Sequence, residues 1–324
     1  MDALIAVNAV PATIDAGTLA HLEQHARDAK GAYAPATERA LRADVAVFTG
    51  WCANARLAHL PALPATVAQF VDAMGEVKAP ATVRRYVSSI ATFHGAAGLT
   101  SPTTTTPVKL ALKRLHIAKG RAQKQASGLN RPLVDRMLAA APNTIIGARN
   151  RALLAVAYDT LCRRSELADL KTADVIADTD GSATVTVRRG KTDQEGMGQV
   201  RYLAADTMQH VNAWRTAAGI TDGALFRAVG KGGRIGGAIL NGELPRIFRA
   251  MATVAGADPA VVAGISGHSS RVGAAQDMVS LGIEMPAVMQ AGGWQSPEMV
   301  ARYTKRIDAR RSGAAKLAVM QNRS

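Results

Sequence analysis

The chain has 324 residues, 48% of them hydrophobic, so it is long and apolar enough for two globular domains, and disorder throughout is excluded. Lys and Arg number 39 against 25 Asp and Glu, and the resulting net charge of +14 predicts a polyanionic partner. Two cysteines, Cys52 and Cys162, are too few for a disulfide framework, and no Cys/His cluster has zinc-site spacing. The chain lacks a basic start and any apolar run near the about 20 residues that span a bilayer, so we expect a cytoplasmic protein without membrane contact.

The first part of the chain is predicted to form a small helical bundle. Aromatic residues are only 4% of the chain while Ala is abundant, which favours Ala, Leu and Val contacts between helices. Residues 36–55 carry an apolar stripe at helical spacing, from Leu41 to Cys52. Further helical patterns, separated by turn-rich segments, cover residues 64–74, 81–97 and 108–117. We therefore expect a mainly helical protein.

Residues 78–131 contain ten Lys and Arg and no Asp or Glu, the clearest charge asymmetry in the sequence. We call this segment the basic stripe. A helical face that is merely solvated normally interleaves Glu with Lys, so a nucleic-acid surface is the favoured interpretation.

The domain boundary is predicted inside the basic stripe. The segment KGRAQKQASGL (residues 119–129) has no helical periodicity and precedes a new helix start. We place the interdomain linker at residues 121–130, between an N-terminal DNA-binding domain of residues 1–120 and a C-terminal domain of residues 131–324.

The second domain is predicted to combine helices with a small sheet. The apolar run of residues 152–158 is typical of a buried helix. Residues 183–187 (ATVTV) alternate strictly and residues 198–203 (GQVRYL) supply a partner strand, which predicts an antiparallel hairpin. Helices resume at Asp206 and continue almost to the end of the chain, interrupted by the glycine-rich residues 230–237.

Two motifs pair an arginine with a second functional side chain three positions away, on one face of a helix. In LCRRSEL (residues 161–167) these are Arg163 and Glu166, and taken alone they are best interpreted as an ordinary ion pair. In GHSSRVG they are His268 and Arg271, between glycines that permit close backbone approach. A lone histidine is usually structural, but this pair near a helix start is suited to hold an anion, because helix N-terminal amides add positive charge.

Two further motifs place a tyrosine and a lysine among basic residues. In GGWQSPEMVARYTKR (residues 292–306), Tyr303 lies about two turns into a helix that begins at the Ser-Pro pair. A phenol of pKa about 10 needs positive surroundings to act as a nucleophile, so Tyr303 is either such a nucleophile or a half-buried structural residue. Lys191, in RRGKTD, lies near the tip of the hairpin, where it reaches into a groove or stays solvated.

Together these motifs resemble the catalytic set of the tyrosine recombinases, the lambda-integrase family. The matching residues, in chain order, are Arg163, Lys191, His268, Arg271, Trp294 and Tyr303. The likeness is strongest over residues 266–306 and weaker through the N-terminal helices, so it covers nearly the whole chain. It implies a mainly α fold, with an N-terminal helical bundle of the core-binding, SAM-like kind and an α-rich catalytic domain containing a small antiparallel β-sheet.

The resemblance implies a nucleophile and the groups that stabilise its transition state. Tyr303 would attack the scissile phosphate, form a 3′-phosphotyrosyl link and expel a 5′-hydroxyl. Arg163 and Arg271 would stabilise the charge on the nonbridging oxygens, since a guanidinium fork donates two parallel hydrogen bonds to phosphate. Trp294 would add its indole N–H as a further donor.

The resemblance also implies groups that move protons. Lys191 is the candidate general acid for the leaving oxygen, and His268 would serve as base or hydrogen-bond partner. Glu166 would orient His268 or Arg163. No metal or other cofactor is expected, because the covalent link conserves the energy of the broken phosphodiester.

The implied partner is double-stranded DNA carrying an inverted-repeat target site, clamped by the two domains. The free protein would be a monomer, and four chains would assemble on two DNA sites, each docking its C-terminal tail (Ser312–Ser324) on a neighbour. Candidate major-groove contacts are Arg84, Arg85 and Ser88, and further candidate DNA contacts are Lys109, Lys113, Arg114, Lys119, Arg121 and Lys124. A type IB topoisomerase and a DNA-binding protein without cleavage activity are the alternatives.

Overall fold

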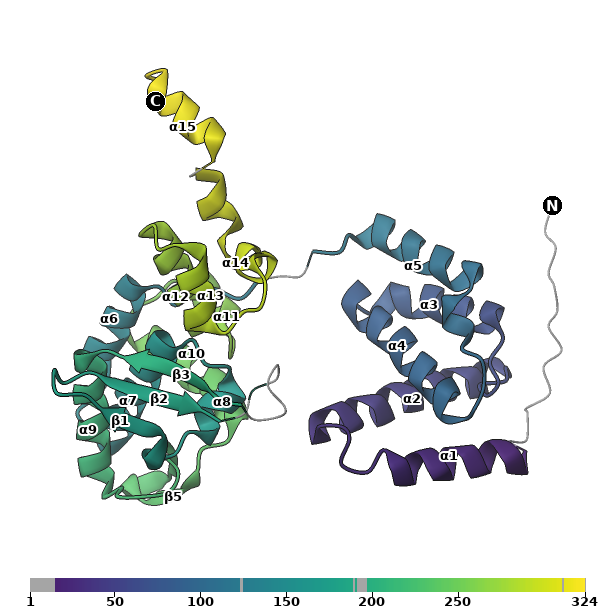
Figure 1. Cartoon of the computed structure of the whole chain (residues 1–324), viewed down its shortest axis with the longest axis horizontal. Coiled ribbons are helices and arrows are strands. Elements are labelled where there is room, and N and C mark those ends of the chain that lie inside the picture. Colours follow the sequence, from purple (N-terminus) through teal and green to yellow (C-terminus); the bar gives the residue numbers. More distant parts are fainter. Residues whose placement is uncertain (1–14, 123–124, 189, 191–196, 311, 324) are drawn as a thin grey trace. The chain divides into compact units, whose positions relative to one another are not determined.

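The computed structural model describes residues 15–122, 125–188, 190, 197–310 and 312–323. The chain divides into two compact units, residues 1–124 and 125–324 (Figure 1). The second half of the predicted linker therefore belongs to the second unit. Leu129 is fully buried in the core of that unit, and the backbone N–H of Ser127 donates to the carbonyl of Gly264 at 2.9 Å. We call residues 125–129 the strap.

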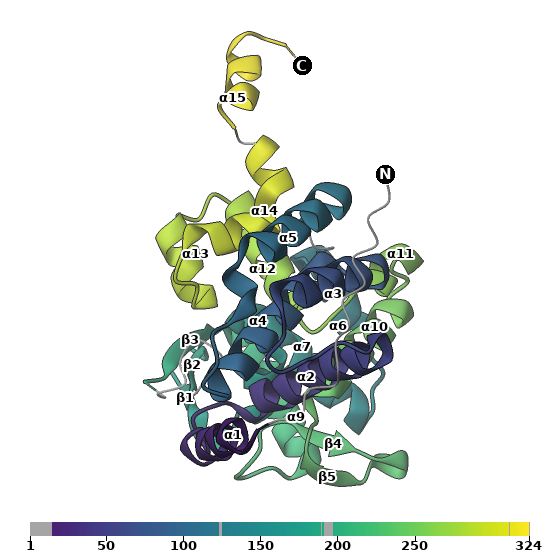
Figure 2. The same cartoon turned by 90° about the vertical axis from the view of Figure 1, so that its right-hand side faces the viewer.

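The first unit is a helical bundle, as the sequence predicts (Figures 1 and 2). Its helices are α1 (Ala16–Asp28), α2 (Pro35–Ala55), α3 (Pro64–Val77), α4 (Pro80–Ala96) and α5 (Thr106–Lys119). A proline in the first turn opens each of α2 to α5, where its fixed φ suits the helix and its missing N–H is not needed. Phe48 and Phe70 pack edge to face in the core, with ring centroids 5.1 Å apart. Helix α1 was not predicted from the sequence.

A buried histidine joins two segments of the first unit. His94, on α4, is fully buried, and its Nε2 accepts a hydrogen bond from the backbone N–H of Ala62 at 2.9 Å. Its Nδ1 lies 2.9 Å from the carbonyl oxygen of Ile90, so the neutral imidazole with a proton on Nδ1 satisfies both partners. Burial lowers the pKa of His94 from its usual value of 6.5.

We expect acid to destabilise the first unit through His94. Its pKa in the folded state lies below the unfolded value of 6.5, so unfolding takes up a proton as the pH falls from 6.5 towards the folded pKa. The stabilisation is complete above that window and is lost within it. Hydrogen exchange of the α3 and α4 amides in the full chain, followed from pH 7.5 to 5, measures the loss. His94→Gln should flatten the pH dependence relative to His25→Gln on α1, and an unaltered pH dependence in His94→Gln would contradict the prediction.

The second unit contains two small antiparallel sheets. The strands β1 (Val175–Ala177), β2 (Ala183–Val187) and β3 (Gln199–Leu203) form the first, in that order. The predicted hairpin of β2 and β3 is confirmed, with Val185 paired to Arg201, and β1 adds a strand at the other edge of β2. The glycine-rich segment predicted only as an interruption forms a second hairpin, β4 (Arg227–Val229) with β5 (Ile235–Ala238).

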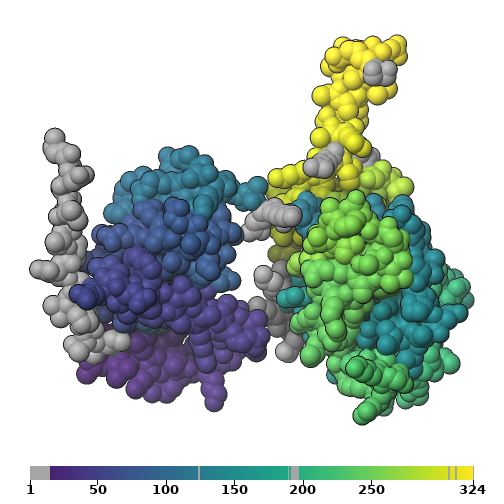
Figure 3. Space-filling view, turned by 180° about the vertical axis from the view of Figure 1, so that it is seen from behind, coloured from purple at the N-terminus to yellow at the C-terminus, as the bar shows by residue number. Residues whose placement is uncertain are grey.

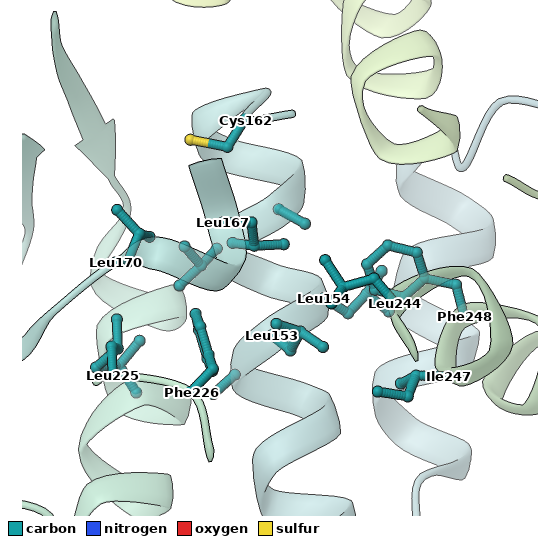
Figure 4. Close-up of a cluster of buried hydrophobic side chains, with 14 of the residues drawn as sticks. Leu153, Leu154, Cys162, Leu167, Leu170, Leu225, Phe226, Leu244, Ile247 and Phe248 are labelled. Carbon is teal, nitrogen blue, oxygen red and sulfur yellow. The ribbon is translucent and has the colours of Figure 1, made fainter. Parts of the chain in front are cut away.

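Helices form most of the second unit, and one of them contains a fully buried segment. They are α6 (Arg131–Ala140), α7 (Ile145–Thr160), α8 (Arg164–Asp169), α9 (Ala205–Ala218), α10 (Leu244–Val254), α11 (Pro259–Gly264), α12 (Ser269–Ser280), α13 (Met285–Gly292), α14 (Pro297–Arg310) and α15 (Gly313–Met320). Helix α7 is buried along residues 152–157, as its apolar run predicts. Leu153 and Leu154 point into a core that includes Leu167, Phe226 and Phe248 (Figure 4). This core holds the C-terminal end of α7 and the start of α8 in place. The site described below begins between these two helices.

A separate apolar cluster unites α12, α13 and α14 and contains Trp294, with Tyr303 packed against it. Helix α15 follows and stands away from this cluster (Figures 1 and 3). Its apolar side chains are uncovered, with Val319 75% and Met320 81% exposed. Over the described residues, no helix is both long and apolar enough to cross a membrane.

Candidate active site

The first arginine of the site is fixed by a buried carboxylate. Arg163 precedes α8, and its Nη1 donates to Oε1 of Glu166 at 2.6 Å. The backbone N–H of Arg163 donates to the other oxygen of Glu166 at 2.8 Å, which caps the helix. The Glu166 side chain is 3% exposed against 16% for Arg163. Of the two residues that the sequence suggested Glu166 would orient, His268 and Arg163, it therefore contacts Arg163 and holds that guanidinium partly buried.

The second arginine is buried. Arg271 lies on α12, is 2% exposed, and its Nη1 donates to the carbonyl oxygen of Leu161 at 2.5 Å. Leu161 ends α7 with a φ of 51°, a left-handed conformation that costs a non-glycine residue about 1–2 kcal/mol. The guanidinium carbon of Arg271 also lies 4.2 Å from the ring centroid of Trp294, a cation–π contact. A strained backbone turn and an aromatic face thus fix this cation.

The neighbouring groups of the site shift the pKa of Arg271. Burial above all, together with the nearby charge of Arg163, lowers the pKa of Arg271 to about 10. Tyr303 and Glu166 oppose this shift. Arg271 stays cationic at neutral pH, and two guanidiniums held close together form a site whose repulsion a bound anion would relieve.

Tyr303 is the tyrosine that the structure brings to these arginines. It lies on α14 with its ring centroid 5.9 Å from that of Trp294. Of the chain's five tyrosines, two belong to the first unit, and Tyr202 is 59% exposed on β3. Tyr158 donates its hydroxyl to Asp277 at 2.6 Å, and burial raises its pKa. Burial also raises the pKa of the Cys162 thiol to about 11, so that thiol stays protonated at neutral pH.

The residue before Lys191 lies beside the first arginine. Lys191 itself lies outside the described residues. A Cβ added to the preceding Gly190 would lie 2.9 Å from Oε1 of Glu166 and 3.7 Å from Nη1 of Arg163. The backbone next to Lys191 therefore packs directly on the Arg163–Glu166 pair.

The histidine motif also starts beside α8. His268 precedes α12 and is an exposed residue, and its backbone N–H donates to Oγ of Ser266 at 3.2 Å. A Cβ on Gly267 would approach Cδ of Arg164 to 2.8 Å, so a larger residue there would force the Arg164 side chain to shift. Among the described residues, no group of three His, Cys, Asp or Glu is placed to hold a metal ion.

A third arginine of the site was missed from the sequence. Arg201, on β3, is 3% exposed and donates to the carbonyl oxygens of Gln290 and Ala291, the former at 2.7 Å. It thereby fastens β3 to the end of α13, just before Trp294. The alternation of the strand was the available signal, because it places Arg201 on the same face as the buried Leu203.

Several side chains of the basic stripe bond to other residues of the same chain. Arg85 makes a two-bond ion pair with the buried Asp44 at 2.7 and 2.9 Å, and Arg114 pairs with Asp72 at 2.6 Å. Lys119 donates to the carbonyl oxygen of Glu76, and Arg131 pairs with two aspartates of the second unit. The candidate contacts Arg84, Ser88, Lys109, Lys113 and Arg121 are exposed, and Lys124 lies outside the described residues.

The sequence profile of the phage integrase family matches residues 129–310. The chain belongs to the phage integrase family. The resemblance to tyrosine recombinases inferred from the site motifs is thereby confirmed. The recombinase cre of Escherichia phage P1 is 27% identical to this integrase-family protein over 292 residues, which cover 83% of this chain and 84% of the relative.

Solved structures share the fold of this integrase-family protein. A Tn1549 transposon integrase in complex with circular intermediate DNA aligns with a TM-score of 0.63 and 13% identity, over 94% of this chain and 99% of that one. A lambda integrase tetramer bound to a Holliday junction aligns with a TM-score of 0.52 and 16% identity, over 75% of this chain and 64% of that one. The predicted fold class, a mainly α chain with a small antiparallel sheet, is confirmed.

Proposed function

We propose that this protein is a site-specific DNA recombinase that cleaves and rejoins duplex DNA through a 3′-phosphotyrosyl intermediate. The observation that carries the proposal is the cluster in which Tyr303 lies beside Trp294 and within electrostatic range of Arg271 and its neighbour Arg163. A nucleophile next to two fixed cations suits attack on a phosphodiester, whose transition state gains negative charge on the nonbridging oxygens.

In the proposed reaction the phenolic oxygen of Tyr303 bonds to phosphorus as the bond to the 5′ oxygen breaks. The leaving oxygen needs a proton, and Lys191 is the proposed donor. The packing of Gly190 against Glu166 supports this role, because Gly190 precedes Lys191 in the chain and lies close to the Arg163 guanidinium. His268 is the proposed acceptor of the Tyr303 proton or its hydrogen-bond partner. Rejoining is the reverse step, with a new 5′-hydroxyl as the attacking group, so no cofactor is consumed.

The proposed substrate is duplex DNA with an inverted-repeat site, which implies a cytoplasmic location. The lambda integrase tetramer on a Holliday junction supports a complex of four chains on two duplexes. The free chain is proposed to be monomeric, because one short helix buries too little apolar area to offset the costs of association.

Affinity for DNA is expected to fall steeply with salt through the exposed lysines of the basic stripe. Lys109→Ala and Lys113→Ala should each reduce the slope of log affinity against log salt by roughly 0.9 for a lost phosphate contact. Arg114 is a poorer choice, since Asp72 already pairs with it. Filter binding across a salt series gives the slope, with Lys30→Ala outside the stripe as control. An unchanged slope in both stripe variants would place these lysines away from the DNA.

The apolar side chains of α15 are expected to join neighbouring protomers. Val319→Asp with Met320→Asp changes two exposed residues, so folding and single-site binding should persist while cooperative pairing and recombination are lost. Native gel shifts on one-site and two-site duplexes measure both properties. Leu281→Asp, 81% exposed outside the tail, is the matched control. Recombination at the wild-type rate by the α15 variant would refute the assignment.

One experiment separates the proposed function from its alternatives. The full-length protein is incubated with supercoiled plasmids that carry zero, one or two copies of a target duplex selected from a random pool by its affinity for the protein. Strand exchange only with two copies supports the recombinase. Relaxation of every plasmid favours a type IB topoisomerase, and retention of DNA without a covalent adduct favours a protein that only binds. Either of the last two results would contradict the proposal.

A further inference from the structure

The main-chain carbonyl of Tyr303 accepts hydrogen bonds from two side-chain amides. Nε2 of Gln276 lies 2.9 Å from this oxygen, and Nε2 of Gln125 lies 3.0 Å from it. Gln276 is on α12, five residues after Arg271, whereas Gln125 is the first residue of the strap. Two segments far apart in the sequence therefore fasten the peptide that carries the candidate nucleophile.

The strap itself is fixed on the end of α11 and the start of α12. The backbone N–H groups of Ser127 and Leu129 donate to the carbonyls of Gly264 and Ser269, each at 2.9 Å. A Cβ built on Gly128 would overlap Oε1 of Gln276, so the strap backbone lies directly against this amide. The close packing fixes the Gln276 side chain with its Nε2 aimed at α14.

The same helix carries the second arginine. A Cβ on Gly273, two residues after Arg271, would overlap the Leu129 carbonyl. The strap, the Arg271 helix and the Tyr303 peptide thus form one tightly packed assembly. An error of about 1 Å in the position of a reacting group can reduce the rate 10²-fold. Contacts that fix the Tyr303 peptide relative to Arg271 can therefore affect the rate at which Tyr303 attacks the phosphate.

We propose that Gln125 and Gln276 are positioning residues that hold Tyr303 in register with Arg271, and that attack requires a seated strap. The proposal rests on the proposed function, because it assumes that Tyr303 is the nucleophile. Gln125 directly follows the residues that join the two units. The segment through which the first unit is attached is thus bonded to the nucleophile's own peptide.

A purely structural role for the two amides predicts a different result. Loss of stabilising hydrogen bonds would lower the melting temperature and the DNA affinity together with the rate. A positioning role predicts that the rate of the covalent step falls while affinity stays the same. A Gln→Glu substitution supplies a second readout, because the introduced carboxyl group donates a hydrogen bond only when it is protonated.

The test begins with a target duplex that the wild-type full-length chain captures covalently from a random pool. Single-turnover cleavage of this duplex is then measured from pH 8 to pH 5. Gln276→Met and Gln125→Met should cleave about tenfold or more slowly with unchanged affinity, because they keep length but lose the donor. Gln276→Glu should be slow at pH 8 and recover relative to wild type towards pH 5, where Gln276→Met should not recover.

Two controls sharpen the result. Gln209→Met removes an exposed amide from α9 and should leave the rate unchanged. A 5′-thiol leaving group should rescue Lys191→Ala but neither Met variant, because their defect lies in attack. Wild-type rates in both Met variants, or a rate loss that follows affinity and melting temperature without acid recovery in Gln276→Glu, would overturn the positioning role alone. Failure of wild type to capture any duplex would overturn the proposed function and the inference with it.

Discussion

Tyr303→Phe is expected to abolish the covalent protein–DNA adduct and leave DNA affinity unchanged. The substitution removes only the phenolic oxygen, and the retained ring keeps its packing beside Trp294, whose centroid is 5.9 Å away. The carbonyl of residue 303 also keeps its two amide partners, so α14 should stay in place. Denaturing gels of protein incubated with the captured duplex measure the adduct, and filter binding measures affinity.

Two other tyrosines provide matched controls for this variant. Tyr202→Phe alters an exposed residue of β3 and should form the adduct as wild type does. Tyr158→Phe removes the hydroxyl that bonds to Asp277, and it tests whether a buried phenol with a raised pKa contributes. A denaturation-resistant adduct in Tyr303→Phe, or its loss only in Tyr158→Phe, would show that Tyr303 is not the nucleophile.

Local patterns in the sequence predicted most helices and the motifs of the site. The apolar run of residues 152–158 predicts a buried helix because every face of that segment meets the core. The Ser-Pro start of α14 and the i,i+3 pairs of α8 and α12 are equally local, since they depend on helix geometry alone. The same is true of the β2–β3 hairpin, whose alternation gives the buried face of each strand.

Contacts between distant segments could not be predicted in this way. Asp44 lies outside the basic stripe, so its pairing with Arg85 is invisible to any count of charge within the stripe. The left-handed Leu161 carries no sequence signal, because its strain is maintained by the hydrogen bond that its carbonyl accepts from Arg271. The sequence of the strap predicts a linker, because Gly and Ser residues favour flexibility. In the structure, however, Gly128 allows the strap to pack closely against α12.

Arg271→Ala is expected to slow DNA cleavage by a factor on the order of 10² or more, the loss typical of one transition-state donor. The guanidinium is desolvated and fixed by Leu161 and Trp294, and it stays cationic because its pKa of about 10 lies well above neutral pH. A cation fixed before the reaction stabilises the charge that develops on the phosphate oxygens without having to reorganise. Single-turnover cleavage of the captured duplex measures the loss.

Further variants separate this effect from a loss of folding. Arg271→Lys keeps the charge, but an ammonium cannot reproduce the planar fork that serves both the Leu161 carbonyl and a phosphate, so it should recover little activity. Arg249→Ala removes a comparable guanidinium bond to a backbone carbonyl, on α10, and should cleave normally. If Arg271→Ala fails to fold, Arg163→Ala tests the same hypothesis on a more exposed side chain. Wild-type cleavage rates in Arg271→Ala, or in Arg163→Ala if Arg271→Ala does not fold, would mean that these guanidiniums do not act on the scissile phosphate.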